Sequence, residues 1–101
     1  MEKVDLFKAL GNDTRLKIIS LLKDESLCAC KILEDIDLSQ STVSHHMKIL
    51  TDSGIIECTK KGKWHHYSLN IETINFLELF FKDLIQEESI NVLEGGCSCD
   101  S

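Results

Sequence analysis

The sequence contains no proline, only five glycines, and aromatic residues at just 6% of its 101 positions. The absence of proline and of repeats excludes collagen-like and proline-rich scaffolds. Its apolar runs span a few residues, whereas a membrane-spanning helix needs roughly 20. The first residues show no basic stretch followed by an apolar one, so no secretory signal is predicted. We therefore expect a cytoplasmic protein without a membrane partner.

What is present indicates one globular domain with an uneven charge. Hydrophobic residues make up 43% and charged residues 28%, and the net charge is −6. Residues 39–70 carry four lysines against two acidic residues and hold all four histidines, whereas residues 71–101 carry seven acidic residues against one lysine. The middle third is therefore the only basic segment, and the overall charge does not exclude a nucleic-acid partner.

Glycines and capping residues divide the first part of the chain into helices. Apolar spacing predicts one helix before Gly11 and a second from the N-cap Asn12 to about Asp24. The residues expected on the apolar side of these helices are Val4, Leu6, Phe7, Leu10, Leu16, Ile19 and Leu22.

Two further short helices follow. Ser26 is predicted to cap a third helix, and Ser39 a fourth that ends at Gly54. Only residues 37–39 separate these two helices, which is typical of a helix-turn-helix. The core side of the fourth helix is expected to hold Val43, Met47 and Leu50.

The second half predicts a β-hairpin and a last helix. Residues 55–59 and 64–69 flank the basic tip Lys60-Lys61-Gly62-Lys63, and the helix begins at Asn70 and frays past Glu88. The fold class is therefore mainly α with a small β-hairpin, a winged helix-turn-helix. Because residues 74–85 are too apolar for so small a core, we expect a homodimer formed through terminal helices. The domain should cover residues 1–94, with a cysteine-containing tail over residues 95–101.

The fourth helix and the hairpin tip have the residue types that read DNA. Short polar side chains on a helix suit base edges and phosphates, and lysines suit neighbouring phosphates. Of the adjacent His45 and His46, one is expected to face DNA and the other the domain interior. The candidate DNA-binding residues are Ser39, Gln40, Ser41, Thr42, Ser44, His45, Lys48, Lys60, Lys61 and Lys63.

Five cysteines form a separate pattern. Cys28 and Cys30 make one Cys-x-Cys pair and Cys97 and Cys99 another, while Cys58 stands alone and is expected to be structural. Reduced, closely spaced thiols favour metal or metalloid ligation, with redox sensing or simple packing as alternatives. On a helix, side chains two residues apart do not face each other. We therefore expect one ion to distort the first turn if it takes both Cys28 and Cys30.

Four stretches resemble the arsenic-repressor (ArsR/SmtB) family. They are Phe7–Leu16 (FKALGNDTRL), Leu27–Leu33 (LCACKIL), Leu38–Leu50 (LSQSTVSHHMKIL) and Gly54–Ile56 (GII). The resemblance covers about residues 4–85. It implies a homodimeric transcriptional repressor that leaves its operator DNA when a toxic metal or metalloid binds.

The resemblance also suggests where the effector binds. The Leu-Cys-x-Cys string matches the thiol site of the arsenic and cadmium/lead sensors, but Leu33 stands where the arsenic pattern often has a third cysteine. Residues 71–94 contain no histidine, so the zinc and nickel site of the last helix is absent. A helix N-terminus favours the thiolate forms of Cys28 and Cys30. Cys97 or Cys99 is the expected third thiolate, with a separate site in the tail as the alternative.

These observations predict a repressor released by As(III) or Sb(III). Cd(II), Pb(II) or Zn(II) is the nearest alternative effector, and thiol-redox or persulfide sensing the next. A metal-carrying or storage module without a DNA role would leave the fourth helix and the hairpin unexplained. An enzyme is not expected, because no catalytic arrangement of Ser, His, Asp or Cys is evident.

Overall fold

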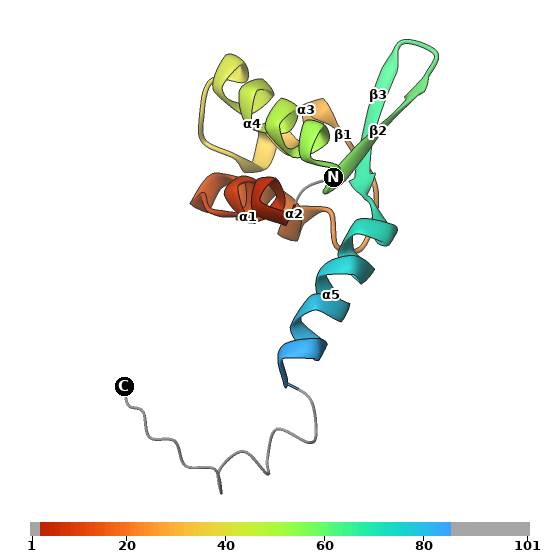
Figure 1. The fold of residues 1–101 in the computed structure, drawn as a ribbon. Helices are drawn as coiled ribbons and strands as arrows, with labels where there is room; N and C mark the ends of the chain where they lie inside the picture. Colours follow the sequence, from red (N-terminus) through yellow and green to blue (C-terminus); the bar gives the residue numbers. More distant parts are fainter. Residues whose placement is uncertain (1–2, 86–101) are drawn as a thin grey trace, which may run out of the picture.

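The computed structural model describes residues 3–85. Within them it contains five helices and a small antiparallel sheet, which confirms the predicted mainly α winged helix-turn-helix (Figure 1). The elements are α1 (Lys3–Leu10), α2 (Asp13–Leu21), β1 (Leu27–Cys28), α3 (Ala29–Asp35), α4 (Gln40–Ser53), β2 (Ile56–Lys61), β3 (Trp64–Leu69) and α5 (Ile71–Ile85). No helix in this part of the chain is long and apolar enough to cross a bilayer.

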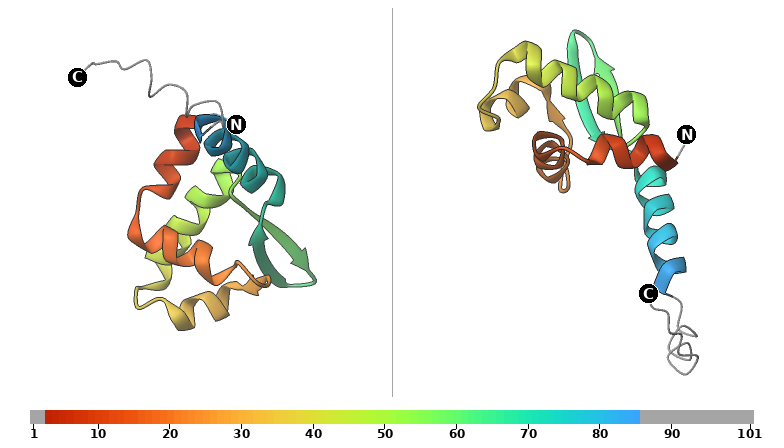
Figure 2. Two further views of the ribbon diagram at one scale, coloured as in Figure 1. Left: turned by 90° about the horizontal axis from the view of Figure 1, so that it is seen from below. Right: turned by 60° about the vertical axis from the view of Figure 1, so that its left-hand side comes forward.

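The core lies where α4 packs against α1, α2 and β2 (Figure 2). Val43, Met47 and Leu50 are buried on α4, as their spacing predicted. The complete set of buried apolar residues is Leu6, Ala9, Ile18, Leu22, Ile32, Ile36, Val43, Met47, Leu50, Ile55, Ile56 and Leu77. Burial of one such side chain contributes about 1.5–3 kcal/mol, so this cluster holds the helices together.

The apolar side of the first two helices differs in part from the prediction. Leu16 is 47% exposed and Val4 63% exposed, while Ile18 is fully buried. The second helix also stops at Leu21, with Leu22 as its C-cap, rather than near Asp24. Of the expected series, Leu22 is buried and Ile19 is partly buried against the core, while Ile18 takes the buried place that was expected for Leu16.

The start of the third helix was predicted wrongly. Leu27 and Cys28 form a short strand, β1, and helix α3 begins only at Ala29. Ser26 therefore does not cap it, and its N-cap is Cys28, which makes no side-chain capping hydrogen bond. The physical reason is tertiary: β1 pairs with β3, with Leu27 opposite Tyr67, so the wing satisfies backbone groups that a longer helix would have used.

The wing is the hairpin β2–β3, and β3 is the central strand of the sheet order β1-β3-β2. Its pairing runs from Ile56 opposite Leu69 to Lys61 opposite Trp64. Gly62 sits at the tip with φ 65°, in the left-handed region that other residues adopt only with strain.

Helix α5 leaves the body on the side opposite the wing (Figures 1 and 2). Asn70 caps it by accepting hydrogen bonds from the backbone N–H groups of Glu72 and Thr73. The buried Thr73 hydroxyl donates to the Gly54 carbonyl at 2.7 Å and so ties α5 to the end of α4. The predicted fraying past Glu88 lies outside the described residues. The exposed apolar residues of α5 are Ile71, Phe76, Leu79, Phe81, Leu84 and Ile85.

Candidate nucleic-acid interface and thiol site

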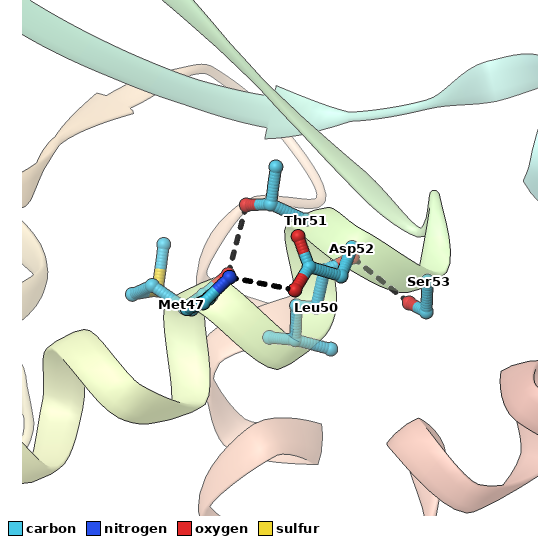
Figure 3. Close-up of polar contacts among 6 residues, drawn as sticks. Met47, Leu50, Thr51, Asp52 and Ser53 are labelled. Carbon is cyan, nitrogen blue, oxygen red and sulfur yellow. Dashed lines mark hydrogen bonds and ion pairs between the residues drawn. The ribbon is translucent and has the colours of Figure 1, made fainter.

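Helix α4 has well-formed ends. At its start, the Ser39 hydroxyl accepts a hydrogen bond from the Thr42 backbone N–H at 3.2 Å, as a capping serine does. At its end, Gly54 adopts φ 89°, and the hydroxyls of Thr51 and Ser53 donate to carbonyls one turn back (Figure 3). Both ends match the predicted caps, Ser39 and Gly54.

The candidate DNA-binding residues of this helix all lie on its exposed side. Ser39 and Thr42 are engaged with each other in the cap, with the Ser39 hydroxyl donating to Thr42 Oγ1 at 2.9 Å. Lys48 forms an exposed ion pair with Asp52, Nζ to Oδ2 3.0 Å. The exposed candidates are Ser39, Gln40, Ser41, Thr42, Ser44, His45 and Lys48. This face is free to meet a partner.

The wing tip presents the other candidates. Lys60, Lys61 and Lys63 are all exposed and surround Gly62. None of the three forms an ion pair with another residue of the described part of the chain. Their charges are therefore available to phosphates.

Cys28 and Cys30 are brought together, contrary to the prediction. Their sulfurs lie 2.7 Å apart, within hydrogen-bond distance. The prediction failed because it placed both cysteines on one helix, whereas Cys28 is the last residue of β1 and only Cys30 lies in the first turn of α3. The extended backbone of Cys28, with φ −79° and ψ 161°, lets its side chain turn toward Cys30. The two sulfurs therefore meet with α3 intact from Ala29 onward.

The contact shifts the pKa values of the two thiols in opposite directions. The hydrogen bond from Cys30 lowers the pKa of Cys28, and backbone N–H groups at the start of α3 lower it further. The same bond, donated by Cys30, raises the pKa of Cys30. The expectation of two favoured thiolates is therefore correct for Cys28 alone.

The other predicted thiol ligands, Cys97 and Cys99, lie outside the described residues. Within residues 3–85, no group of three or more His, Cys, Asp or Glu residues is arranged to hold a metal ion. Among these residues, therefore, no third His, Cys, Asp or Glu side chain joins the Cys28–Cys30 pair in such a group.

The two histidines of α4 point in different directions, as expected. His45 is exposed, while His46 is partly buried and its Nδ1 lies 3.1 Å from Arg15 Nη1. Burial, and then the charge of Arg15, lower the pKa of His46. Arg15 also donates from Nε to the Ala9 carbonyl at 2.6 Å and from Nη2 to the Lys8 carbonyl at 3.3 Å. Residue patterns did not reveal this role of Arg15, because its partners lie 6 to 31 residues away in the chain.

Cys58 is exposed on β2, and its sulfur lies 3.5 Å from Nδ1 of His65 on β3. The neighbouring Tyr67 is opposite Cys58 in the ladder, and burial together with Cys58 raises the pKa of Tyr67. Cys58 was expected to be structural; it is exposed rather than packed in the core, and its contact with His65 lies at the surface. Its spacing from His65 in the hairpin was the signal that could have predicted the pair.

The fold and the exposed α4 and wing define a winged helix-turn-helix protein of the DNA-binding type. Residues 12–57 match the family described as "Bacterial regulatory protein, arsR family". The chain is 40% identical over 94 residues to the arsenical resistance operon repressor of Staphylococcus xylosus, covering 93% of this chain and 85% of that protein. The chain belongs to the arsR family of bacterial regulatory proteins.

Two further comparisons agree. A cadmium resistance transcriptional regulatory protein CadC homolog of Staphylococcus aureus is 41% identical over 78 residues, covering 76% of this chain and 64% of that protein. The structure of HlyU from Vibrio cholerae N16961 superimposes with a TM-score of 0.67 at 32% identity, covering 85% of this chain and 100% of that one. The predicted family and the expectation of a transcription regulator rather than an enzyme are confirmed by these relatives.

Proposed function

We propose that this chain is a transcriptional repressor that binds operator DNA as a homodimer and leaves it when As(III) or Sb(III) binds its cysteine thiolates. The observation that carries the proposal is the 2.7 Å contact between the sulfurs of Cys28 and Cys30 at the start of α3. Helix α3 is the first helix of the helix-turn-helix, so an effector bound there lies next to the DNA-reading unit. The arsenical resistance operon repressor of S. xylosus supports arsenic as the effector.

DNA contact is assigned to the exposed face of α4 and to the wing tip. Helix α4 enters the major groove, where Gln40, Ser44 and His45 meet base edges and Lys48 meets a phosphate. The three wing lysines contact neighbouring phosphates, which makes the affinity fall steeply with salt. Ser39, Ser41 and Thr42 lie at the N-terminus of α4 and contact DNA phosphates, which the positive end of the helix dipole also attracts.

The effector site is assigned to Cys28, Cys30 and a tail cysteine, Cys97 or Cys99. Two sulfurs bound to one ion by bonds of about 2.3 Å at tetrahedral angles lie roughly 3.7 Å apart. The pair, now at 2.7 Å, therefore fits a single thiophilic ion after a small side-chain adjustment. The third thiolate completes the coordination of a trivalent metalloid. In this assignment residues 1–94 form the DNA-binding domain and residues 95–101 the ligand-bearing tail.

The two cysteines lie on elements next to the DNA-binding surface, so a bound effector can change the arrangement of that surface. Cys28 belongs to β1, which pairs with the wing strand β3, while Cys30 belongs to α3. An ion that holds both sulfurs and a third ligand fixes α3 relative to the wing. Release then follows because this fixed arrangement matches the operator less well than the free one.

The dimer is assigned to α5 and α1. Leu79 is 62% exposed, Leu84 65% and Ile85 69%, and this apolar surface continues through Phe81 to Phe7 of α1, whose rings lie 6.0 Å apart. A contiguous apolar face of this kind marks an interface, and a second copy of the same chain is complementary to it by two-fold symmetry. The two α4 helices of a dimer then meet half-sites about one helical turn apart.

Fluorescence anisotropy of the reduced full chain on DNA from upstream of its own gene tests the proposal. Arsenite, cadmium, zinc and a mild oxidant are added separately. Release by near-stoichiometric arsenite supports the proposal, and no release by arsenite contradicts it. Ser44→Ala with His45→Ala serves as the control: it should abolish DNA binding and leave arsenite affinity unchanged, which a storage module would not show.

Two alternatives keep the DNA role and change the effector. A cadmium-, lead- or zinc-sensing repressor is favoured by the similarity to the CadC homolog. A thiol-redox or persulfide sensor is favoured by the short distance between the sulfurs, because a peroxide could take two electrons and two protons from the pair and leave a disulfide and water. Release by only one of the added agents distinguishes these cases.

The dimer assignment has its own test. Leu79→Glu places a charge in the exposed apolar face of α5 and should convert the protein to a monomer in sedimentation velocity. Asn75→Glu, at an exposed polar position of the same helix, is the matched control and should leave the dimer intact. A wild-type protein that is monomeric at micromolar concentration would contradict the assignment.

A further inference from the structure

The single tryptophan of the chain, Trp64, is exposed on the wing. It begins β3 next to the hairpin tip, and 57% of the residue is exposed. Within residues 3–85 its ring makes no ring–ring or cation–π contact, and its Nε1–H has no hydrogen-bond partner. The hairpin projects beyond the helices, so its tip stands clear of the core (Figure 1). Trp64 therefore offers an exposed ring and an unpaired donor in the part of the chain that the structure describes.

Trp64 lies among residues already assigned to DNA. It lines a groove of about 290 Å³ together with Gln40, the first residue of α4, and Lys63 of the wing tip. Lys61 is opposite Trp64 in the β2–β3 ladder, and residues directly opposite in such a ladder share a face of the sheet. A duplex that touches both Gln40 and the wing lysines passes over Trp64. The positive charge around the ring and its continuity with the α4 surface both favour DNA as its partner.

The place of the wing beside α4 decides which groove of the DNA the ring meets. In the proposed function α4 occupies the major groove, and the phosphate strand that borders this groove also borders the neighbouring minor groove. The wing lysines contact that strand. An apolar side chain next to them therefore reaches the sugars and base edges of the minor groove, where DNA-binding proteins commonly insert apolar side chains.

We propose that Trp64 enters the minor groove beside each half-site and favours A·T pairs there. The inference rests on the DNA role in the proposed function and adds a residue that distinguishes base sequences. The indole N–H only donates hydrogen bonds. The minor-groove edge of an A·T pair offers only acceptors, adenine N3 and thymine O2, whereas a G·C pair adds the N2 amino donor of guanine. A G·C pair therefore sets one donor against another and fills space that the ring needs.

The fluorescence of Trp64 tests the contact directly, because the chain has no other tryptophan. The reduced full chain, without effector, is titrated with DNA from upstream of its own gene and excited where DNA does not absorb. Acrylamide should quench the emission strongly in the free chain and weakly in the complex. Equal quenching in both states would overturn the inference. Weak quenching in the free chain would also overturn it, because another segment or a second copy would then already cover the ring.

Trp64→Ala and Lys63→Ala make a matched pair of variants at neighbouring exposed positions. Trp64→Ala should lower the DNA affinity about tenfold at every salt concentration, because an apolar contact releases no counterions. Lys63→Ala should instead reduce the slope of log affinity against log salt by about one for each bound subunit. An equally reduced slope in Trp64→Ala would show that the substitution only displaces the lysines, and would overturn the inference.

Base substitutions test the preferred pair. Hydroxyl-radical footprinting locates the minor-groove sugars that the original chain protects and Trp64→Ala does not. The A·T pairs at these positions are replaced by G·C or by inosine·cytosine, which lacks the N2 amino group. The original chain should bind the G·C fragment about fivefold or more weakly and the inosine·cytosine fragment nearly as well as the A·T fragment. Trp64→Ala should bind all three alike. An equal loss with inosine·cytosine, or no loss with G·C, would contradict minor-groove recognition.

The outcomes separate this inference from the proposed function. If Trp64 is protected by DNA and the base preference is found, but arsenite does not release the DNA, the effector assignment fails and the role of Trp64 stands. If arsenite releases the DNA while Trp64→Ala binds it as tightly as the original chain, the proposed function stands and this inference fails.

Discussion

Arg15 of α2 and His46 of α4 are joined by a contact of 3.1 Å between Nη1 and Nδ1. Because the guanidinium only donates hydrogen bonds, Nδ1 of His46 must be the unprotonated acceptor. The same guanidinium donates to the carbonyls of Lys8 and Ala9 at the end of α1. One side chain therefore connects the end of the helix assigned to dimerisation with the helix assigned to DNA.

Removing this side chain should destabilise the fold. Arg15→Gln loses most of the three side-chain hydrogen bonds, which should lower the free energy of unfolding by about 1–3 kcal/mol. Urea denaturation at pH 7.5 measures the change. Lys17→Gln, an exposed position on the same helix, is the control and should stay within about 0.5 kcal/mol of the original chain. Equal stabilities of the two variants would show that the Arg15 contacts contribute nothing.

His46 should make stability depend on pH. Its pKa is lowered in the folded chain by burial and by Arg15, while in the unfolded chain it stays near 6.5. Above that pH both states hold the ring neutral and nothing is lost. As the pH falls through about 6.5, the unfolded chain takes up the proton first, so the free energy of unfolding decreases until the pH is below the folded pKa.

The variant His46→Gln isolates this effect, because the amide oxygen still accepts from Arg15 but does not titrate. Its urea denaturation between pH 8 and pH 5.5 should lose less stability than that of the original chain. His45→Gln changes the exposed neighbour and should leave the original pH dependence in place. The same pH profile in all three proteins would exclude His46 as its source.

The two thiols of the candidate effector site should react in a fixed order. The hydrogen bond from Cys30 lowers the pKa of Cys28, and thiolates are the reactive species, so iodoacetamide should alkylate Cys28 before Cys30 near pH 7. Peptide mass spectrometry over time measures both rates. Cys30→Ala removes the donor and should slow alkylation of Cys28, whereas Cys30→Ser keeps a hydroxyl donor and should slow it less. Faster alkylation of Cys30 would reverse the assigned direction of the bond.

Freeing Lys48 should strengthen DNA binding. Lys48 is paired with Asp52 across one turn of α4, and both side chains are exposed. An exposed pair of this kind is worth about 0–1 kcal/mol, so Asp52→Asn should raise DNA affinity by up to about fivefold at low salt. Anisotropy at two salt concentrations should show the gain shrinking as salt rises. Asp83→Asn on α5 makes the same charge change away from α4 and should have a smaller effect.

Local signals in the sequence predicted most of the fold. Asn12, Ser39 and Gly54 bound helices as their capping preferences indicate, and the basic Lys-Lys-Gly-Lys stretch forms the tip of the predicted hairpin. Each of these features depends on a few consecutive residues. The core positions of the fourth helix could be predicted equally well, because a 3.6-residue period appears directly in the order of the residues.

The errors fall where one segment depends on another far away in the chain. A two-residue strand such as β1 has no pattern of its own and exists because β3 offers a free edge. Treating that segment as helix also separated Cys28 from Cys30 in the prediction. Leu16 was expected in the core and Ile18 was missed for a similar reason, since the helices that pack against α2 decide which of its sides is covered.

The sequence by itself therefore determined which elements form, where most of them end, which face of α4 is polar, and which family the chain resembles. Tertiary structure alone decided that the sulfurs of Cys28 and Cys30 meet, that His46 accepts from Arg15, and that Trp64 shares a groove with Gln40. The physical reason is range. Capping and periodicity act within one or two helical turns, whereas these contacts arise only after strands pair and helices pack across dozens of residues.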